Sequence, residues 1–282
     1  MKISYERKRI SLLTKHGKES IIAPILKRTL GCDIELVQSF DTDELGTFDN
    51  TVKPQGNQLQ TVRRKAQIGI DFSGNTLGVA SEGSFAPDPF SGFMPWNIEM
   101  VIFLDDLHGI EVVGVAQGSA MSMGKFVRNI DELLQFAQDA GFPQHHLMLR
   151  PEQENDSRIV KGLHSLNDLT VAYIEAQQQA ANGKVFVEND LRAFANPTRQ
   201  HLIAQATEDL ARKLLSLCPQ CGMPGYWKFT TSAGLLLSAH GSSKKLPAAN
   251  LHQGLRGGSP RRLIGCIACP HPIDQHHQLF VT

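Results

Sequence analysis

The chain has 282 residues, of which 41% are hydrophobic and 20% charged, a composition typical of globular proteins that excludes general disorder. Basic and acidic residues number 28 each, which excludes a global electrostatic attraction to nucleic acid or to an anionic membrane. No apolar run approaches the ~18 residues of a membrane helix, and the start lacks the apolar core of a signal peptide. We therefore expect a cytoplasmic protein without a membrane partner.

The first segment predicts a strand, a loop, a helix and a second strand. Residues 10–14 form a short apolar run, and residues 22–30 carry apolar side chains at helical spacing before Gly31 ends the helix. A second apolar run covers 34–37. This order is typical of the start of an α/β sheet. After a polar stretch, a further helix is predicted over 59–70.

The rest of the body predicts five more strands and three more helices. The strands are expected at 77–80, 100–104, 111–115, directly after His145–His146, and at 184–188, and the helices at 129–140, 165–181 and from 196 to the first cysteine pair. We therefore predict an α/β domain over residues 1–217, with a mixed sheet flanked by helices. Residues 218–282 form a separate tail, expected to be a small zinc ribbon or irregular.

The loop between the first strand and the first helix is a candidate phosphate site. Thr14, His16 and Lys18 supply a hydroxyl, an imidazole and an ammonium group, and N–H groups at a helix N-terminus attract phosphate. The glycine spacing is not that of a Walker loop. An ordinary solvated loop is the alternative interpretation.

Glu82 is a candidate magnesium ligand. It follows the apolar run 77–80, at the end of a strand where α/β sheets place functional groups, and small neighbours leave room for a ligand. Mg²⁺ takes one or two carboxylates together with phosphate oxygens. The alternative is a glutamate that caps the following turn.

Two carboxylates and two arginines precede or open the last long helix. In an extended stretch Glu188 and Asp190 point to the same face, and Arg192 follows. Arg199 lies in the first helical turn, where an anion is favoured. This pattern predicts catalytic carboxylates beside phosphate-binding arginines, and its alternative is an internal network of salt bridges.

Four of the five cysteines form two Cys-x-x-Cys pairs, Cys218/Cys221 and Cys266/Cys269, separated by 44 residues. Two such pairs predict a closed, structural four-cysteine zinc site, with histidines of the tail as alternative ligands. A thiol redox role is disfavoured because the first pair follows a helix end. Residues 228–282 hold six basic residues and one acidic residue, which makes nucleic acid a candidate partner of the tail.

Four short strings resemble an uncharacterised bacterial family of unknown function. They are His-Gly-Lys-Glu at 16–19, Phe-Asp-Thr-Asp at 40–43, Ala-Ser-Glu-Gly-Ser-Phe at 80–85 and Asn-Pro-Thr-Arg at 196–199. Members of that family end in a zinc-ribbon-like tail that begins Cys-Pro-x-Cys-Gly, as residues 218–222 do. A further cysteine pair usually follows soon after in the family, whereas residues 233–241 contain no cysteine.

The order of motifs also resembles, more remotely, that of the house-cleaning nucleoside triphosphatases (inosine/xanthosine triphosphatase and Maf-like proteins). Those enzymes begin with a strand and a Thr/Ser-x-Asn-x-x-Lys phosphate loop, to which residues 14–18 correspond, with His in place of Asn. A helix with alanine and basic residues follows, like 64–66, and then a strand ending in an acidic residue and glycine, like 82–83. An arginine then opens a long helix, like Arg199.

This second resemblance implies a triphosphatase-like fold and gives each candidate a role. Glu82 would bind Mg²⁺ carried by a nucleoside triphosphate, and the loop at 14–18 would hold the phosphates. Arg199 would contact phosphate or base, and Glu188 or Asp190 would orient the attacking water.

The expected function is Mg²⁺-dependent hydrolysis of a nucleoside triphosphate to the monophosphate and diphosphate, or nucleotide binding by a protein descended from such an enzyme. The alternative is a non-catalytic adaptor whose zinc-binding tail contacts nucleic acid or protein. The small-molecule partner expected is a nucleotide or another phosphorylated compound, and the sequence leaves a homodimer open.

Overall fold

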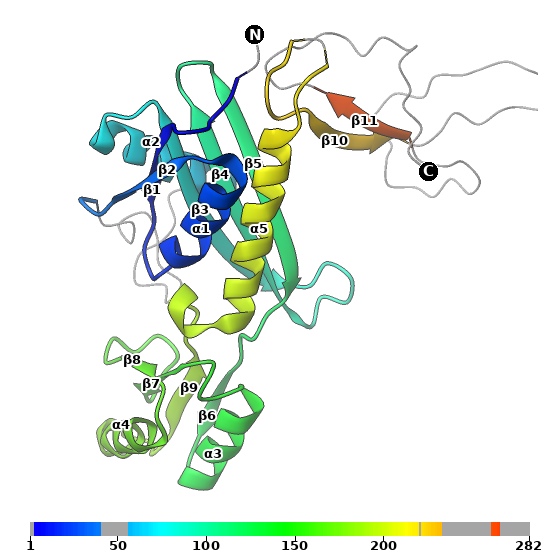
Figure 1. The fold of residues 1–282 in the computed structure, drawn as a ribbon. Coiled ribbons are helices and arrows are strands. Elements are labelled where there is room, and N and C mark those ends of the chain that lie inside the picture. Colours follow the sequence, from blue (N-terminus) through cyan, green and yellow to red (C-terminus); the bar gives the residue numbers. More distant parts are fainter. Residues whose placement is uncertain (1–2, 41–55, 220, 233–260, 266–282) are drawn as a thin grey trace, which may run out of the picture. The chain divides into compact units, whose positions relative to one another are not determined.

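The computed structural model describes residues 3–40, 56–219, 221–232 and 261–265. Contacts divide the chain into two compact units, Tyr5–Ala211, and Met1–Ser4 together with Arg212–Thr282. The larger unit contains two sheets and their helices (Figure 1). The fold is therefore α/β with a mixed sheet, as predicted.

The first sheet has five strands in the order β2-β1-β3-β4-β5. Their bounds are β1 Arg9–Leu13, β2 Asp33–Val37, β3 Leu77–Pro87, β4 Pro95–Asp105 and β5 Ile110–Ser119. The first three strands are parallel, and β4 and β5 continue the sheet in antiparallel pairing.

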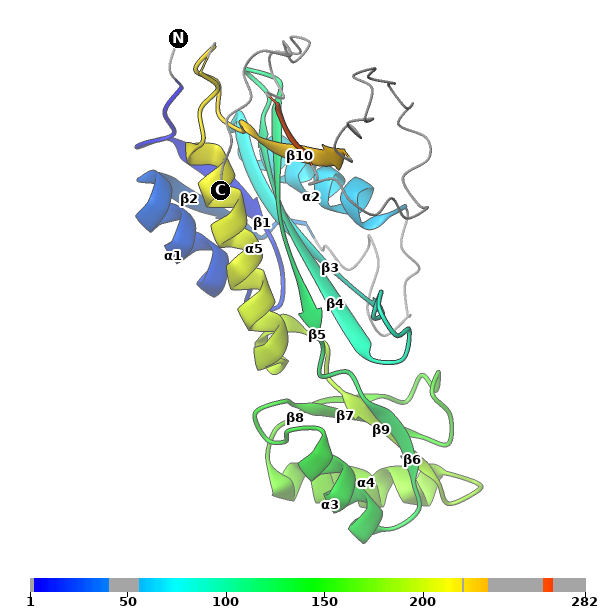
Figure 2. The same cartoon turned by 90° about the vertical axis from the view of Figure 1, so that its right-hand side faces the viewer.

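Three helices cover the two faces of this sheet: α1 (Glu19–Leu30), α2 (Gln58–Ser73) and α5 (Pro197–Leu215). Helix α2 lies on one face, and α1 and α5 lie on the other (Figures 1 and 2). The α2 face is sealed by an apolar cluster, made of Val62, Ala66, Ile70, Ala80, Ile102 and Leu104. On the α5 face, Gly114 permits close packing, because a Cβ there would collide with Ala206 and Leu210.

The ends of the helices follow local sequence signals. The Asn57 side chain accepts a hydrogen bond from the Gln60 N–H, and the Gln60 side chain accepts one from the Asn57 N–H, which closes a capping box at the start of α2. Gly31 ends α1 in a left-handed conformation with φ 67°, as the sequence predicts.

Strand β3 is longer than the sequence predicts. We expected it to end at Ala80, where the apolar run stops, but pairing with β4 continues from Leu77 opposite Asp105 to Pro87 opposite Pro95. Glu82 therefore lies within a strand and not after one. The apolar run is a poor guide here because the polar side chains of this stretch find partners inside the protein.

The second sheet has four antiparallel strands in the order β6-β9-β7-β8. Their bounds are β6 Gly124–Val127, β7 Leu147–Pro151, β8 Val160–Leu163 and β9 Val185–Asn189. Helices α3 (Ile130–Asp139) and α4 (Leu166–Gln179) cover one face (Figure 2). As predicted, they begin at Asn129 and Ser165, whose side chains accept N–H hydrogen bonds three residues ahead.

Two chain segments, 120–123 and 190–196, connect the second sheet to the first. They are tied to each other and to β9, because the Met123 N–H donates to Asn189 Oδ1 and Asn196 Nδ2 donates to the Met121 carbonyl, each at 2.9 Å. A short 3-10 helix, Ala193–Ala195, leads directly into α5.

The tail contains two strands that the sequence analysis does not predict, β10 (Trp227–Ser232) and β11 (Arg261–Gly265), paired antiparallel. Before them, an isolated bridge joins Leu217 to Pro224. Among the described helices, none is both long enough and apolar enough to cross a membrane.

Candidate functional site

The candidate site lies where β1 ends and β3 continues without it. Residues Ser11–Leu13 of β1 pair with Gly78–Ala80 of β3, and the residues of β3 after Ala80 have no partner in β1. There the chain turns into α1 through His16 and Gly17, whose φ values of 64° and 77° are left-handed. This opening at the carboxyl end of a parallel strand is the usual position for a ligand in an α/β sheet.

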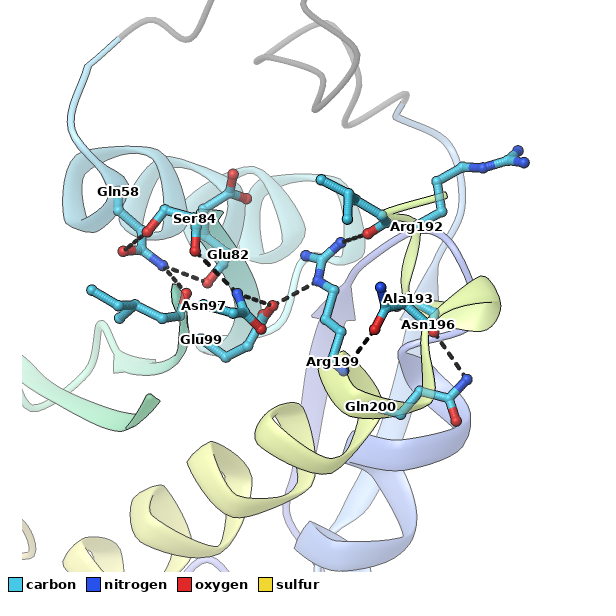
Figure 3. A network of polar contacts seen from close by, with 12 residues as sticks. Gln58, Glu82, Ser84, Asn97, Glu99, Arg192, Ala193, Asn196, Arg199 and Gln200 are labelled. Atoms are coloured by element: carbon cyan, nitrogen blue, oxygen red, sulfur yellow. Dashed lines mark hydrogen bonds and ion pairs between the residues drawn. The ribbon is translucent and has the colours of Figure 1, made fainter. Parts of the chain in front are cut away.

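One pair of charges lies on the α2 side of β3. Lys65 Nζ is 2.5 Å from Glu82 Oε2, and the two side chains are 9% and 18% exposed. The Gln58 side chain fixes this end of α2 to the sheet by donating to the carbonyls of Glu82 and Ile98 and accepting from the Ser84 hydroxyl (Figure 3). Glu82 is thus a held carboxylate that retains access to solvent.

A second pair lies on the α5 side of the same strand. Arg199 Nε donates to Glu99 Oε1 at 2.6 Å, and both side chains are at most 1% exposed. Asn97 Nδ2 also donates to Glu99 Oε1, at 3.1 Å, and Arg199 Nη1 donates to the Leu191 carbonyl (Figure 3). Gly83 is needed between them, because a Cβ there would collide with both Glu99 and Arg199.

Lys18 connects the two pairs electrostatically. It is 5% exposed, and burial is the main cause that lowers its pKa from 10.5 to about 7. Arg199 and Lys65 lower this pKa further, whereas the carboxylates of Glu99 and Glu82 raise it. Three cations and two carboxylates therefore lie within electrostatic reach of one another, and they come from the residue before α1, from α2 and α5, and from β3 and β4.

A cavity of about 520 Å³ opens beside the β1–α1 loop. Its lining is formed by Thr14, Lys15, His16, Gly17, Glu19, Leu36, Gln38, Ser39 and Phe40. A volume of this order accommodates a small-molecule ligand. Two of the three phosphate-binding candidates of the loop, Thr14 and His16, thus line a cavity, and the third, Lys18, belongs to the charged cluster.

The carboxylates predicted near the last helix are not in this cluster. Glu188 pairs with Arg150 across β9 and β7, and Asp190 pairs with Arg192 at 2.5 Å. Neither carboxylate is among the charges that shift the pKa of Lys18. For these residues the geometry fits the alternative interpretation, local salt bridges.

Arg192 lies instead in an aromatic group next to the loop. Its guanidinium is 4.7 Å from the centre of the Phe194 ring, and Phe194 lies 6.3 Å from the ring of His16 and 6.0 Å from that of His146. The Phe194 N–H donates to the His16 carbonyl. This group therefore joins the phosphate-loop candidate to the segment that precedes α5.

Sequence reasoning gave no site role to two members of the cluster, Lys65 and Glu99, or to Asn97, which donates to Glu99. The sequence held a signal for Asn97 and Glu99. They occupy alternate positions of β4, on the same face as the buried Val101 and Phe103. A glutamate and an asparagine at core-facing positions of a strand require polar partners.

The first cysteine pair forms a tight turn. The Cys218 N–H donates to the Met223 carbonyl and the Gly222 N–H donates to the Cys218 carbonyl, both at 2.8 Å. Neither cysteine forms a disulfide within the described part of the chain. Cys266 and Cys269 lie outside the described residues. Within the described ranges no group of three histidine, cysteine or acidic side chains could hold a metal ion by itself.

The fold and the site define an α/β protein with a partly buried cluster of cations and carboxylates at the end of a parallel strand. A family model matches residues 65–252, more than half of the chain, and the chain therefore belongs to that family, a domain of unknown function (DUF6671). This confirms the predicted membership of an uncharacterised family. No curated protein matches the chain.

Proposed function

We propose that the protein hydrolyses a nucleoside triphosphate to the monophosphate and diphosphate with Mg²⁺. One observation carries this proposal: Lys18, Lys65 and Arg199 surround Glu82 and Glu99 at the end of β1. With Lys18 protonated, three cations against two carboxylates leave one net positive charge, and a bound polyphosphate would favour that protonated form, which suits a polyphosphate better than a neutral substrate.

The residues present fit a magnesium ion that arrives with its substrate. The donors are hard oxygens, and Glu82 is a carboxylate that keeps contact with solvent. A site of this kind needs only one or two carboxylates because phosphate oxygens and waters complete the coordination. When bound, the ion would neutralise charge that develops on the phosphates.

The chain's own residues supply positioning and charge. Lys18 and the loop at Thr14–His16 hold phosphate oxygens at the start of α1, and Lys65 keeps the Glu82 carboxylate oriented. Arg199 adds a fixed positive charge whose direction is set by Glu99 and the Leu191 carbonyl. Preorganised charges of this kind stabilise the transition state because they need no reorganisation during the reaction.

The test is release of diphosphate and phosphate from a panel of standard and damaged nucleoside triphosphates, with Mg²⁺ or Mn²⁺. We expect turnover of one substrate class, lost in Glu82→Gln and retained in Glu111→Gln, a matched glutamate paired with Arg63 on the surface. No turnover by folded protein, or turnover that survives Glu82→Gln, would contradict the proposal. The first outcome would favour the adaptor, with nucleic acid as its partner.

We also propose that the tail binds structural zinc through Cys218, Cys221, Cys266 and Cys269. Two observations support this. The first pair already forms a turn closed by hydrogen bonds, and β11 pairs Gly265, the residue before Cys266, with Trp227, six residues after Cys221. Strand β11 therefore ends, one residue before Cys266, opposite the start of the strand that follows the first pair, in spite of the long spacer between the two pairs.

Metal analysis of the purified full chain tests this site. We expect about one zinc per chain, lost in Cys218→Ser and retained in Cys32→Ser, a buried cysteine of the larger unit. Full-chain protein that stays metal-free when purified with zinc, or zinc retained in Cys218→Ser, would refute the proposal.

A further inference from the structure

The α5 face of the first sheet concentrates buried oxygen atoms that have no hydrogen-bond partner. They are Thr14 Oγ1, Ser81 Oγ, Asn97 Oδ1 and Glu99 Oε2, and no described residue bonds to them. Buried polar atoms without partners are rare in folded proteins, and a group of them indicates a bound polar molecule. The side chains of Ser81, Asn97 and Glu99 belong to residues that are at most 2% exposed.

Strand pairing brings the residues that carry these atoms to neighbouring positions on one face of the sheet. Leu13 is opposite Ala80, so Thr14 follows beside Ser81, and Gly83, two residues on, is opposite Glu99. Ser81, Gly83 and Glu99 therefore point to the same face of the sheet. Gly83 carries no side chain, and its space is taken by Glu99 Oε1 and the Arg199 guanidinium.

The two oxygens of Glu99 have different surroundings. Oε1 accepts hydrogen bonds from Arg199 Nε and Asn97 Nδ2, which fixes the orientation of the carboxylate. Oε2 accepts none from the described residues. Glu99 also acts on the pKa of Lys18, so it lies within electrostatic reach of the phosphate-binding cluster. A carboxylate oriented through one oxygen and open at the other has the arrangement of a general base.

We infer that Glu99 Oε2, with the hydroxyls of Ser81 and Thr14, holds the attacking water and accepts its proton. This inference rests on the proposed function and gives Glu99 the role that the sequence suggested for Glu188 or Asp190. One O–H bond of the water breaks and its proton passes to Glu99 Oε2. The water oxygen forms a bond to the α-phosphorus, and the bond from that phosphorus to the bridging oxygen breaks. Diphosphate leaves with the electron pair.

The hydrogen-bonding capacity of these four oxygen atoms favours a bound water molecule over a cation at this position. Glu99 Oε2 and Asn97 Oδ1 can only accept, whereas the two hydroxyls can both donate and accept. A water molecule satisfies both kinds at once. A metal ion there would face the neighbouring charges of Arg199 and Lys18, whereas Glu82 on the other side of the strand remains open to solvent.

The experiment compares Glu99→Gln with wild type and with Glu111→Gln on the substrate found in the panel. The glutamine amide oxygen can still accept from Arg199, but its nitrogen cannot accept a proton. We expect kcat to fall by about 10²–10⁴-fold, the usual contribution of a general base, while KM and nucleotide affinity change by less than about threefold. Glu99→Asp should restore part of kcat.

A second variant covers the case in which Glu99→Gln does not fold. Ser81→Ala removes one of the two hydroxyls and keeps both the buried ion pair and the phosphate-binding loop, and it should lower kcat by about tenfold at unchanged KM. A kcat within about fivefold of wild type in folded Glu99→Gln, or a loss confined to KM, would overturn the inference. Such an outcome for Glu99→Gln removes only this inference if wild type turns over substrate and Glu82→Gln does not, because the proposed function then stands. Absence of wild-type turnover removes both.

Discussion

The first sheet has a cluster of charged side chains buried between its strands and helices, whereas the core of the second sheet is apolar and its buried Arg150 is not part of that core. Lys18, Lys65, Glu99 and Arg199 are all at most 7% exposed around the first sheet. The core of the second sheet consists of Val127, Leu133, Phe136, Ala137, Ala140, Leu147, Leu149, Leu163, Leu169, Ala172, Tyr173, Ala176, Val185 and Val187. Removing charged groups from water can cost more free energy than their pairing returns. We therefore expect the polar site to lower the stability of the first sheet, a cost that the apolar core of the second sheet does not carry.

The largest difference should follow removal of one buried cation from each sheet. Arg199→Met leaves Glu99 buried without its partner, and we expect the free energy of unfolding to fall by about 3–5 kcal/mol. In Arg150→Met the partner, Glu188, is 25% exposed and can be hydrated, so a loss of about 1–2 kcal/mol is expected. Urea denaturation of both variants checks the order, and equal losses would break the comparison.

A smaller effect is expected from a single added methyl group in the first sheet. In Gly83→Ala the new Cβ would displace Glu99 and Arg199, and overpacking of this kind costs about 1–3 kcal/mol. Gly118→Ala on β5 is the matched control, since its Cβ would lie 3.4 Å from Leu202, an ordinary contact. Thermal unfolding should give a lower melting temperature for Gly83→Ala than for Gly118→Ala. Equal melting temperatures would contradict the explanation that the new Cβ collides with Glu99 and Arg199.

Lys18 should make stability depend on pH. Its pKa is about 7 in the folded protein, against 10.5 for a lysine exposed to water, so between these values the unfolded chain binds more protons. The free energy of unfolding should therefore rise with pH over this range, by at most ~1.4 kcal/mol per pH unit. The penalty is fully present below pH 7.

The variant Lys18→Met removes this proton linkage. It should be most stabilising relative to wild type near pH 6 and progressively less so toward pH 9, measured by denaturant titration. The exposed Lys27 on α1 provides the control, and Lys27→Met should follow the wild-type slope. A wild-type slope that persists in Lys18→Met would assign the linkage to another group.

The smallest effect compares helix caps of the two sheets. Asn57→Ala on α2 and Ser165→Ala on α4 each remove a side-chain acceptor at a helix start, which costs about 1 kcal/mol. Only Asn57 precedes Gln58, which holds the end of α2 to Glu82 and Ile98. We therefore expect similar losses in stability but a reduced turnover in Asn57→Ala alone, and equal activities would show that α2 needs no cap to hold the site.

Local signals predicted much of the fold. Apolar spacing and caps were sufficient for α1, α2 and α5, whose boundaries depend on residues such as Gly31 and Pro197. Strands β6 and β8 were not predicted, because each has only four residues and one buried residue, so there is no alternation of apolar and polar residues to detect. The full length of β3 was not predicted either, because it depends on pairing with β4.

The candidate site was predictable only in part. Lys18, Glu82 and Arg199 occupy recognisable positions at a loop, a strand and a helix start, and the structure places them in one electrostatic cluster. Alternation predicted Glu188 and Asp190 on one face beside arginines. The partner of Asp190 is the neighbouring Arg192, whereas the partner of Glu188, Arg150, depends on strand order and not on spacing. Glu99 lies a hundred residues from Arg199, so only the assembled sheet reveals the pair.

The connection between the two sheets has an architectural consequence. The chain leaves the first sheet after β5 and returns just before α5, and the exit and return segments are joined by Met121–Asn196 and Met123–Asn189 hydrogen bonds. Entry and exit points that lie side by side are the mark of a module inserted into a host fold. The host already possesses the sheet, the three helices and all five charges of the cluster, so the inserted module can diversify while the charged centre stays constant.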